Sequence, residues 1–358
     1  MTAVVFTLEA VDSWFFRDGT PFGEGIVVST GIRGTFPPPV QTLQGAIRTG
    51  LALANGWPIE RPLDWPHDFG APEGTGSVQF VGPFVVAASG DPLWPVPRIV
   101  WQDAQFKRRT RLRLSSPRTT DLGVRRLPRV RRGERLAGGW VTTDEVYRVL
   151  ADPCAVPDRI FSADDLYCAE LHVGVQRQDR RVKDGGLYVV HHARPLPGVR
   201  VGLVMRDCPA DVTVPDRMMV RLGGEGRAAA VVATHPTADP WPARPELVPA
   251  DGVVRYFISL LTDAGVPSDS QLAMEGPAAA PGHVVSASIG ASGRVGGYDL
   301  QARAPRPLRT TLPAGTTWFM EADEDNLPAV QALHATSAVG RRELGEGWMV
   351  VGRWEEEP

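Results

Sequence analysis

The chain has 358 residues, of which 43% are hydrophobic, and this is enough for two domains with buried cores. Its 33 prolines and 38 glycines predict short strands and many turns rather than long helices. An apolar run of about 20 residues, which a membrane-spanning helix needs, is absent. The first residues also lack the basic and cleavage segments of a secretory signal. Three cysteines without a Cys-x-x-Cys pair argue against disulfides and zinc, so a cytoplasmic location is expected.

The formal net charge of −3 conceals a strongly basic stretch between Lys107 and Arg135. Twelve basic and two acidic residues give this stretch a net charge of +10, whereas the rest of the chain carries −13. Because guanidinium groups bind phosphate in a bidentate manner, this pattern predicts a polyanion partner, with a solvated loop as the alternative. Pro117 and Pro128 argue against one continuous basic helix. The candidate contacts in this stretch are Arg125, Arg126, Arg131 and Arg132.

The N-terminal part begins with apolar residues that alternate from Val4 to Leu8, which predicts a first β-strand. The prolines at 37–39 then hold the chain extended. Thr42 is the expected N-cap of a helix over 43–55, whose apolar residues recur at helical spacing. This helix carries Arg48. The start of such a helix is either an anion or phosphate site or an ordinary loop-to-helix joint.

The middle of the chain alternates strands with one short helix. Strands are predicted at 77–88 and 94–101, and a helix is predicted at 144–150 with Thr143 as its N-cap. These elements flank the basic stretch on both sides, so the basic stretch is expected to be an insertion between regular elements.

A β-hairpin is predicted next, with a strand at 170–177, a polar loop at 178–186 and a partner strand at 187–190. The loop carries Arg180 and Arg181. Such a loop either grips a nucleic-acid backbone or is an ordinary exposed hairpin tip.

The C-terminal part combines strands with glycine-rich loops at 223–227 and 340–347. Glycine allows another backbone to approach closely, but the Gly-Lys-Ser/Thr of a Walker phosphate loop is absent. Strands interleaved with a few short helices predict a β-rich α+β protein in two halves. The remaining predicted elements are strands at 199–205, 218–222, 228–233, 253–263, 315–321 and 349–354 and a helix at 326–338.

Catalytic motifs of the GxSxG, HExxH and Walker types are absent from the sequence. His191 and His192 are adjacent on a predicted strand, so their rings point to opposite faces and cannot chelate one metal. The acidic pair at 164–165 and the acidic run at 321–325 are either magnesium ligands or solvated surface. His172 is a candidate general base for RNA cleavage, but no second catalytic group is evident near it. We therefore expect no metal, no cofactor and no enzymatic activity.

Several sequence blocks occur in the order of one known family. They resemble the subunit of the type III-B CRISPR–Cas Cmr complex that lies at the 5′ end of the guide RNA, the third subunit in the usual Cmr naming, of the RAMP superfamily. Each block is weakly specific alone, but together they span almost the whole chain. The blocks are SWFFRDGTPFG, FPPPVQTLQGAIRTGL, HVGVQRQDRRVKDGGLYVV, VRLGGEGRAA, GRVGGYDL, LPAGTTWFM and GRRELGEGW.

This resemblance implies two ferredoxin-like (RRM-like) RAMP domains with glycine-rich loops and inserted segments. The first would cover residues 1–155, with the arginine-rich insertion at about 105–137. The second would cover residues 156–358 and include the closing glycine-rich loop. The resemblance implies a non-catalytic protein of antiviral defence that binds the crRNA 5′ handle. It would link the large polymerase-like subunit to the backbone subunit and meet target RNA only indirectly.

The resemblance also carries RNA-binding candidates onto this sequence, to which the hairpin loop adds Arg180 and Arg181. Two features depart from the family pattern: Tyr298 stands where the family often has tryptophan, and the arginine-rich stretch has no counterpart in it. The carried-over residues are Arg17, Arg33, Gly34, Arg48, His172, Arg177, Gly224, Arg227, Arg341, Arg342, Gly345 and Gly347.

Two alternatives to this function remain. One is a metal-independent RAMP endoribonuclease that processes pre-crRNA, with His172 or His191 as the base. The other is the equivalent handle-binding subunit of another type III subtype. The chemistry of a single-stranded handle agrees with the binding role, because the handle offers phosphates to arginines and bases to aromatic rings.

Overall fold

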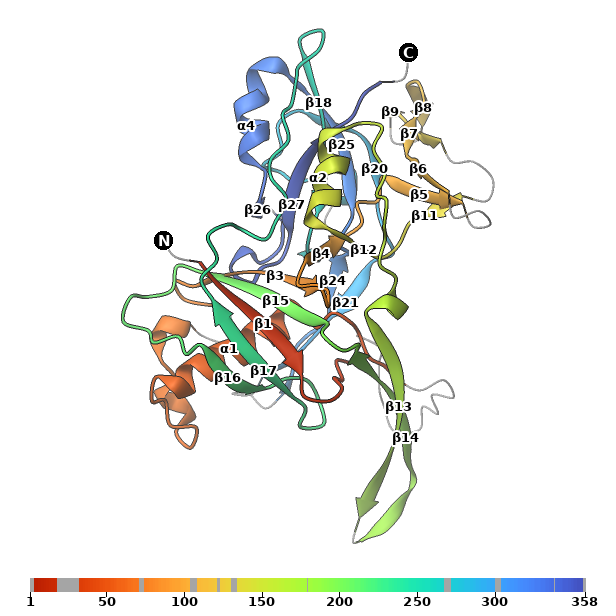
Figure 1. Ribbon diagram of the computed structural model, residues 1–358. Helices are drawn as coiled ribbons and strands as arrows, with labels where there is room; N and C mark the ends of the chain where they lie inside the picture. The colour runs from red at the N-terminus through yellow and green to blue at the C-terminus, as the bar shows by residue number, and fades with distance from the viewer. Residues whose placement is uncertain are drawn as a thin grey trace. The chain divides into compact units, whose positions relative to one another are not determined.

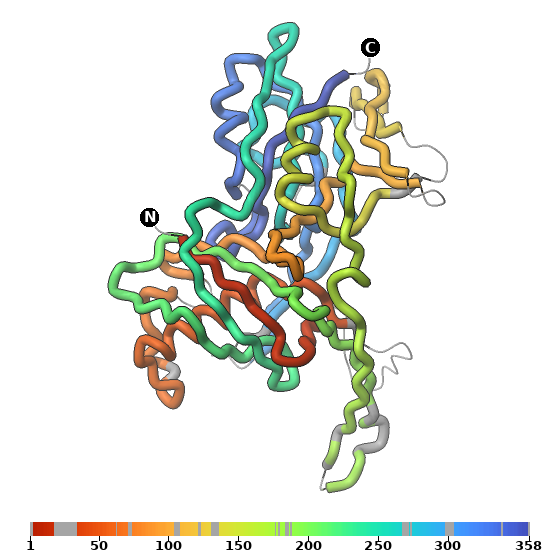
Figure 2. Tube along the Cα trace, viewed as in Figure 1, coloured from red at the N-terminus to blue at the C-terminus, as the bar shows by residue number. Residues whose placement is uncertain are grey.

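The structure is a computed structural model, and it describes residues 3–17, 32–70, 74–103, 108–120, 123–129, 134–178, 180–266, 272–299, 304–337 and 339–356. The chain divides into two compact units, each built from three segments (Figures 1 and 2). Unit 1 comprises Met1–Gly90, Ala163–Thr237 and Arg294–Arg309, and unit 2 comprises Asp91–Ser162, Ala238–Gly293 and Thr310–Pro358. The chain therefore passes between the units several times, whereas the predicted division at 155/156 follows sequence order.

The sheet of unit 1 is built around its first strand, β1 (Val4–Ala10). This strand pairs antiparallel with both β15 (Arg200–Arg206) and β17 (Ala228–Thr234). β3 (Gln79–Val86) extends the sheet beyond β15, and β16 (Arg217–Arg221) extends it beyond β17. The first segment of the chain is thus held between two strands from its middle third.

The core of unit 1 lies between this sheet and helix α1 (Val40–Ala54), which packs on β16 (Figure 1). Leu43, Ile47 and Leu51 follow one another at intervals of four residues, and all three are fully buried. A stripe at this spacing forms one face of a helix, so the sequence pattern correctly predicted which side of α1 faces the sheet.

The start of α1 differs from the sequence prediction. The helix begins at Val40, with Pro39 as its N-cap, and no side chain caps it. Thr42 was therefore wrong as the N-cap, because its amide already donates to the carbonyl of Pro39 within the first turn (2.9 Å). The fixed φ of proline orients the chain for helix entry without a polar cap.

A long hairpin leaves the sheet region of unit 1 (Figure 1). Its strands, β13 (Tyr167–Gln178) and β14 (Arg181–Pro195), pair antiparallel over nearly their full length. The short strand β2 (Ile32–Arg33) pairs parallel to β14. The predicted loop at 178–186 was wrong, because Gln178 ends β13 and residues 181–186 belong to β14.

Unit 2 has its own antiparallel sheet, with β18 (Val253–Leu260) between β25 (Thr317–Asp323) and β27 (Trp348–Arg353). β20 (His283–Ser288) pairs with β25, and β26 (Thr336–Ser337) pairs with β27. The buried side chains of these strands form the core of this unit.

The helices of unit 2 are short. α2 (Thr143–Ala151) is capped by Thr142, whose hydroxyl accepts from the amide of Glu145, so the predicted cap Thr143 was one residue late. α4 (Leu327–Ala332) is much shorter than the predicted helix at 326–338, and α3 (Leu272–Glu275) is a single turn.

The predicted strand at 94–101 is two strands, and the arginine-rich stretch forms short strands. The described residues of the arginine-rich stretch contain no continuous helix, as predicted. These strands are β4 (Pro92–Pro95), β5 (Val100–Asp103), β6 (Arg109–Arg111), β7 (Arg113–Leu114), β8 (Arg118–Thr120), β9 (Gly123–Arg125), β10 (Pro128–Arg129), β11 (Glu134–Leu136) and β12 (Trp140–Thr142). The remaining strands are β19 (Ala264–Val266), β21 (Gly293–Val295), β22 (Tyr298–Asp299), β23 (Ala304–Pro305) and β24 (Arg309–Leu312). Single 3-10 turns lie at Pro62–Asp64, His67–Phe69, Ala163–Asp165, Glu324–Asn326 and Arg342–Leu344.

The predicted α+β class is confirmed at the level of mainly antiparallel sheets with few helices. The finer prediction, two ferredoxin-like domains, stays a prediction. Among the described residues, no helix combines the length and the apolar character needed to cross a membrane.

Arg111 shows that part of the basic stretch serves the fold of unit 2. Its Nη1 donates to the carbonyls of Val149 (2.8 Å) and Asp152 (3.0 Å), where α2 ends, and its Nη2 donates to the carbonyl of Arg353 (3.1 Å). The guanidinium also lies over the ring of Phe257, and burial lowers the pKa of Arg111 to about 10. A cation here satisfies the free carbonyls at the negative end of the helix dipole.

We expect Arg111→Met to lower the free energy of unfolding by roughly 2 kcal/mol, because the carbonyls of Val149, Asp152 and Arg353 lose their donor. Urea unfolding followed by circular dichroism measures this effect. Arg113→Met is the matched control, since Arg113 is exposed on the next short strand. Equal stability of the two variants would contradict the structural role of Arg111.

Candidate functional site

The N-terminal segment of unit 1 lies along the base of the β13–β14 hairpin. Trp14 and Ala193 exchange two backbone hydrogen bonds of 2.8 Å, and the amide of Gly34 donates to the carbonyl of His191 (2.9 Å). Arg17 and Gly34 form an isolated antiparallel bridge with one another. Segments that are far apart in the sequence are therefore joined at one edge of the hairpin.

The glycine-rich loop at 223–227 closes over the same segment. The amide of Gly224 donates to the carbonyl of Phe15 (2.8 Å). Gly223 has a φ of +91°, and a Cβ on it would lie only 2.9 Å from the same carbonyl oxygen. Only glycine meets both requirements, so this loop approaches the N-terminal segment more closely than a larger residue would allow.

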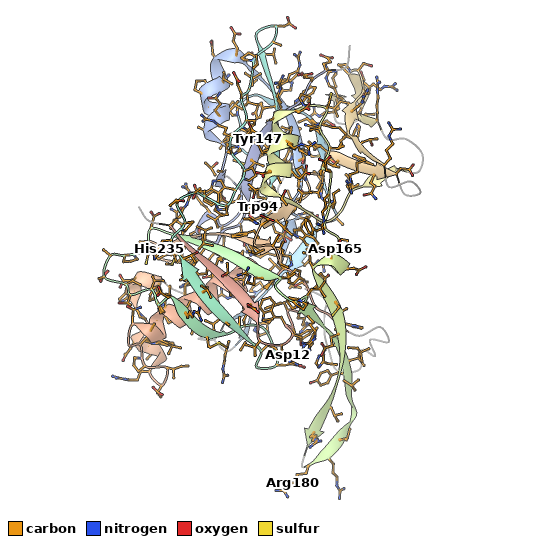
Figure 3. All side chains as sticks on the ribbon, viewed as in Figure 1. Asp12, Trp94, Tyr147, Asp165, Arg180 and His235 are labelled. Atoms are coloured by element: carbon orange, nitrogen blue, oxygen red, sulfur yellow. The ribbon has the colours of Figure 1, made fainter. Side chains whose placement is uncertain are left out.

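An ion network links the three segments. Arg194 donates to Asp12 (Nη2 to Oδ1, 2.6 Å) and also pairs through Nε with Glu170. Arg227, from the glycine-rich loop, donates to the second oxygen of Asp12 (2.6 Å). The hydrogen bonds from Arg194 hold the pKa of Asp12 and that of Glu170 below their ordinary values, and the two carboxylates raise the pKa of Arg194. Asp12 lies at the hairpin base in Figure 3.

Two histidines are stacked beside this network. The ring of His192 is 1% exposed and lies 4.0 Å from the ring of His172 and 5.2 Å from that of Phe15, centroid to centroid. Its Nδ1 is 3.0 Å from the hydroxyl of Ser13, and its Nε2 is 3.1 Å from a carboxylate oxygen of Glu225. Burial lowers the pKa of His192, and the neighbouring His172 and Arg227 lower it further, so the ring stays neutral near pH 7.

His172 itself is more accessible than His192. Its Nε2 lies 2.8 Å from Oε1 of Glu170, and its side chain is partly exposed. The contact places a carboxylate beside His172, but Nε2 makes no hydrogen bond in this arrangement, so the contact is an ion-pair distance without the alignment of a hydrogen bond.

The outer part of the hairpin carries the basic residues that the sequence singled out. Arg177, Arg180 and Arg181 are all exposed, and Figure 3 shows Arg180 at the far end of the hairpin. Leu171 and Val173, on one face of β13, are 57% and 59% exposed. The hairpin therefore presents cations near its tip and an apolar face nearer its base.

The structure brings together most of the candidates predicted in unit 1. For Arg33, in β2, the structure describes only the backbone. The candidates that share the hairpin, its base or the loop against it are Arg17, Arg33, Gly34, His172, Arg177, Arg180, Arg181, Gly224 and Arg227.

Arg48 lies in the interior of unit 1 instead. Its side chain is 5% exposed, and it donates to Gln44 Oε1 and to the carbonyl of Gly74, both at 3.0 Å. The guanidinium also lies 5.7 Å from the centre of the Trp65 ring. Burial lowers its pKa to about 10, with a further contribution from Arg306. These contacts favour the loop-to-helix joint over an anion site at the start of α1.

The closing loop of unit 2 is organised around the buried carboxylate of Glu346. One oxygen of this carboxylate accepts from the amides of Gly265 (3.2 Å) and Arg341 (3.0 Å). Gly347 has a φ of +66°, and a Cβ on it would strike the carbonyl oxygen of Val339. The carbonyl of Gly345 accepts from Thr262 Oγ1 (2.9 Å). Arg341 and Arg342 thus flank a loop whose glycines serve internal packing.

The candidates of the arginine-rich stretch, which were chosen by charge alone, differ in their surroundings. Arg126 pairs with Glu356 (2.7 Å), whereas Arg125 is partly exposed at the end of β9. Arg131 and Arg132 lie outside the described residues. No group of three potential metal ligands lies close together in the described part of the chain.

Sequence reasoning missed the carboxylates and Arg194 that hold the site together. Asp12 and its partner Arg227 are 215 residues apart, and Ser13 and His192 are 179 residues apart. Such distances leave no spacing pattern, so only the pairing of strands reveals these partners.

A family model described as CRISPR-associated protein (Cas_Cmr3) matches residues 6–354. A match over nearly the whole length defines the class of protein as CRISPR-associated. The chain belongs to the Cas_Cmr3 family, whose members are subunits of the type III-B Cmr complex, and this confirms the resemblance carried by its sequence blocks.

Similar chains occur in solved type III complexes. A chain of the type III-B Cmr-beta complex bound to cognate target RNA and AMPPnP is 11% identical, with 88% of this chain and 86% of that chain covered and a TM-score of 0.48. A second structure of Cmr-beta with cognate target RNA gives 12% identity, the same coverages and a TM-score of 0.45. The Csm3–Csm4 subcomplex of a type III-A interference complex gives 11% identity, coverages of 99% and 100%, and a TM-score of 0.39. The comparison with curated proteins gives no match.

We expect the stability of the protein to fall as the pH drops below 6.5, the ordinary pKa of histidine, partly because of His192. The folded chain keeps this ring neutral, so the unfolded chain takes up the proton first and is stabilised by it. A histidine that is neutral in the folded chain and protonated in the unfolded chain lowers the free energy of unfolding by about 1.4 kcal/mol per pH unit in that window. Thermal unfolding between pH 7.5 and 5 should therefore show a shallower decline for His192→Gln than for the unmodified chain.

His191→Gln is the matched control, because His191 lies next to His192 on the opposite face of β14. The same decline in the unmodified chain and in His192→Gln would show that the buried ring does not govern this pH dependence.

Proposed function

We propose that this chain is the non-catalytic subunit of a type III-B Cmr effector that binds the 5′ handle of crRNA. The observation that carries the proposal is the convergence of three of the seven sequence blocks, those that contain Ser13, His172 and Gly224, at the base of the β13–β14 hairpin. There the Asp12–Arg194–Glu170 and Asp12–Arg227 contacts tie the N-terminal segment, the hairpin and the glycine-rich loop together.

The chemistry of the hairpin suits single-stranded RNA. Arg177, Arg180 and Arg181 are exposed cations for phosphates, and Tyr188, also exposed, is an aromatic ring on which a base can stack. The hydroxyl of Tyr188 donates to Glu225 (3.4 Å), which links this ring to the glycine-rich loop. In this proposal the ion network positions the binding groups, and the buried His192 supports them without touching RNA.

The partner subunits follow from the family. We propose that the chain joins the large polymerase-like Cmr subunit to the backbone subunit and meets target RNA indirectly through the crRNA. The same site would serve an equivalent handle-binding subunit of another type III subtype, but the family match favours type III-B.

A second candidate, a metal-independent endoribonuclease that processes pre-crRNA, draws on one observation. Nε2 of His172 lies 2.8 Å from a carboxylate oxygen of Glu170, which places an acidic group beside the candidate general base. Cleavage of RNA by an acid–base pair also needs a second accessible group, and the stacked partner His192 is buried. This geometry favours binding over cleavage.

We expect the triple variant Arg177→Gln, Arg180→Gln, Arg181→Gln to bind handle RNA about tenfold more weakly, with the salt slope reduced by about 0.7 for each phosphate that the variant no longer binds. Fluorescence anisotropy with the repeat-derived 5′ segment measures both quantities. Arg61→Gln, Arg217→Gln, Arg221→Gln removes the same charge from exposed positions of unit 1 and is the matched control. Equal weakening by both variants would refute a specific role for the hairpin.

The nuclease alternative is tested by incubating the protein with repeat RNA in EDTA. We expect the RNA to stay intact. Site-specific cleavage that His172→Ala abolishes would replace the binding proposal with the endoribonuclease.

A further inference from the structure

The carboxylate of Glu356 bridges two arginines of unit 2 that lie far apart in the sequence. One of its oxygens lies 2.7 Å from Nη2 of Arg126, in the arginine-rich stretch. The other oxygen lies 3.6 Å from Nη2 of Arg255, in β18. The two guanidinium groups therefore converge on one anionic group, each through a different oxygen atom.

Both sides of the contact between Arg126 and Glu356 are held in place by the fold. The indole of Trp354, which is 5% exposed, donates from Nε1 to the carbonyl of Met320 (3.1 Å) and so fixes the segment that follows β27. On the other side, the backbone amide of Arg126 donates to the carbonyl of Val285 in β20 (3.0 Å). The contact therefore joins two segments that are each anchored separately.

Strand pairing positions Arg255. It lies directly opposite Glu321 of β25 in the register of the sheet, and its Nε donates to a carboxylate oxygen of this residue (3.3 Å). Its Nη2 is the atom that approaches Glu356. Arg255 therefore has one carboxylate partner within the sheet and a second one from the segment after β27.

The members of this bridge differ in their exposure to solvent. The side chains of Arg126 and Arg255 are 14% and 21% exposed, whereas that of Glu356 is 43% exposed. A rotation of the Glu356 side chain therefore takes its carboxylate into water and leaves both guanidinium groups largely desolvated. A desolvated cation that loses its partner is costly, so another anion is favoured in the same place.

We propose that Arg126 and Arg255 form a phosphate-binding site for a nucleic-acid backbone, and that Glu356 occupies this site in the unbound chain. A phosphodiester has two non-bridging oxygens, and guanidinium groups bind carboxylate and phosphate in the same geometry. Glu356 is then an autoinhibitory group that a phosphate displaces. The site lies in unit 2 and does not depend on handle binding at the β13–β14 hairpin.

A nucleic-acid backbone is better suited than an acidic peptide to displace Glu356. Because Glu356 is tethered beside the site, a carboxylate of another chain has the same chemistry without the advantage of high local concentration. Phosphates of a nucleic acid release condensed counterions when arginines neutralise them, which adds free energy that isolated carboxylates do not provide. Arg125, the neighbour of Arg126 in the chain, is partly exposed and offers a further cation to such a ligand.

The test uses the full chain and a labelled oligouridine of about 15 nucleotides, a length within the range that single-strand sites cover. Glu356→Gln should bind it between about twofold and fivefold more tightly, the range expected when one exposed ion pair no longer has to be broken. In an Arg126→Gln or an Arg255→Gln background the same substitution should bring no gain, because half of the site is missing. Fluorescence anisotropy measures these affinities.

Glu246→Gln is the matched control, since it removes the same negative charge from an exposed position of unit 2 and should leave the affinity unchanged. Thermal unfolding shows which variants are folded, and the two arginine backgrounds keep the test decisive if one of them is not. The proposal is overturned if Glu356→Gln binds no more tightly than the unmodified chain. It is also overturned if the control gains as much, or if the gain persists in a folded arginine background.

Competitors separate the possible sources of the anion. Unlabelled oligouridine should displace the labelled one from Glu356→Gln, whereas inorganic phosphate should act no better than sodium chloride of equal ionic strength. Polyglutamate should compete more weakly than oligouridine. Displacement by inorganic phosphate or by polyglutamate as readily as by unlabelled oligouridine would overturn the assignment to a nucleic-acid backbone.

Discussion

The bridge that Arg194 forms between Asp12 and Glu170 is the contact on which the rest of the candidate site depends. One planar guanidinium meets two carboxylates from different segments, and Arg227 adds a second cation to Asp12. Surface ion pairs of this kind are individually weak, but a connected network holds several segments in one geometry. His172 contacts Glu170 of this network, and its ring stacks on His192, which in turn stacks on Phe15. The hairpin, the glycine-rich loop and the N-terminal segment are therefore joined at one place.

The glycine-rich loops have a different role from the one that their composition suggests. In the loop at 340–347, backbone amides bind the carboxylate of Glu346, and Gly347 fits against a carbonyl of Val339 that any side chain would strike. In the loop at 223–227, Gly223 and Gly224 meet the carbonyl of Phe15. Several of the groups that the loops were expected to offer to RNA are thus used within the protein. Exposed arginines are left as the groups best suited to contact phosphates.

Membership of the Cas_Cmr3 family and the geometry of unit 1 are connected, because sequence blocks of the family meet at the base of the β13–β14 hairpin. The family defines the kind of protein, and the geometry is the basis on which the proposed function selects a surface.

The strands could be predicted from the residues alone, because alternating apolar residues specify which face is buried, and the family could be predicted from blocks in a fixed order. The basic stretch was likewise visible in the sequence. Which arginines face inward depends on the folded chain, since Arg48, Arg111 and Arg126 find acceptors on other segments. The length of the β13–β14 hairpin likewise depended on strand pairing. Contacts such as Asp12 with Arg227 arise from that pairing, and no local pattern in the chain records them.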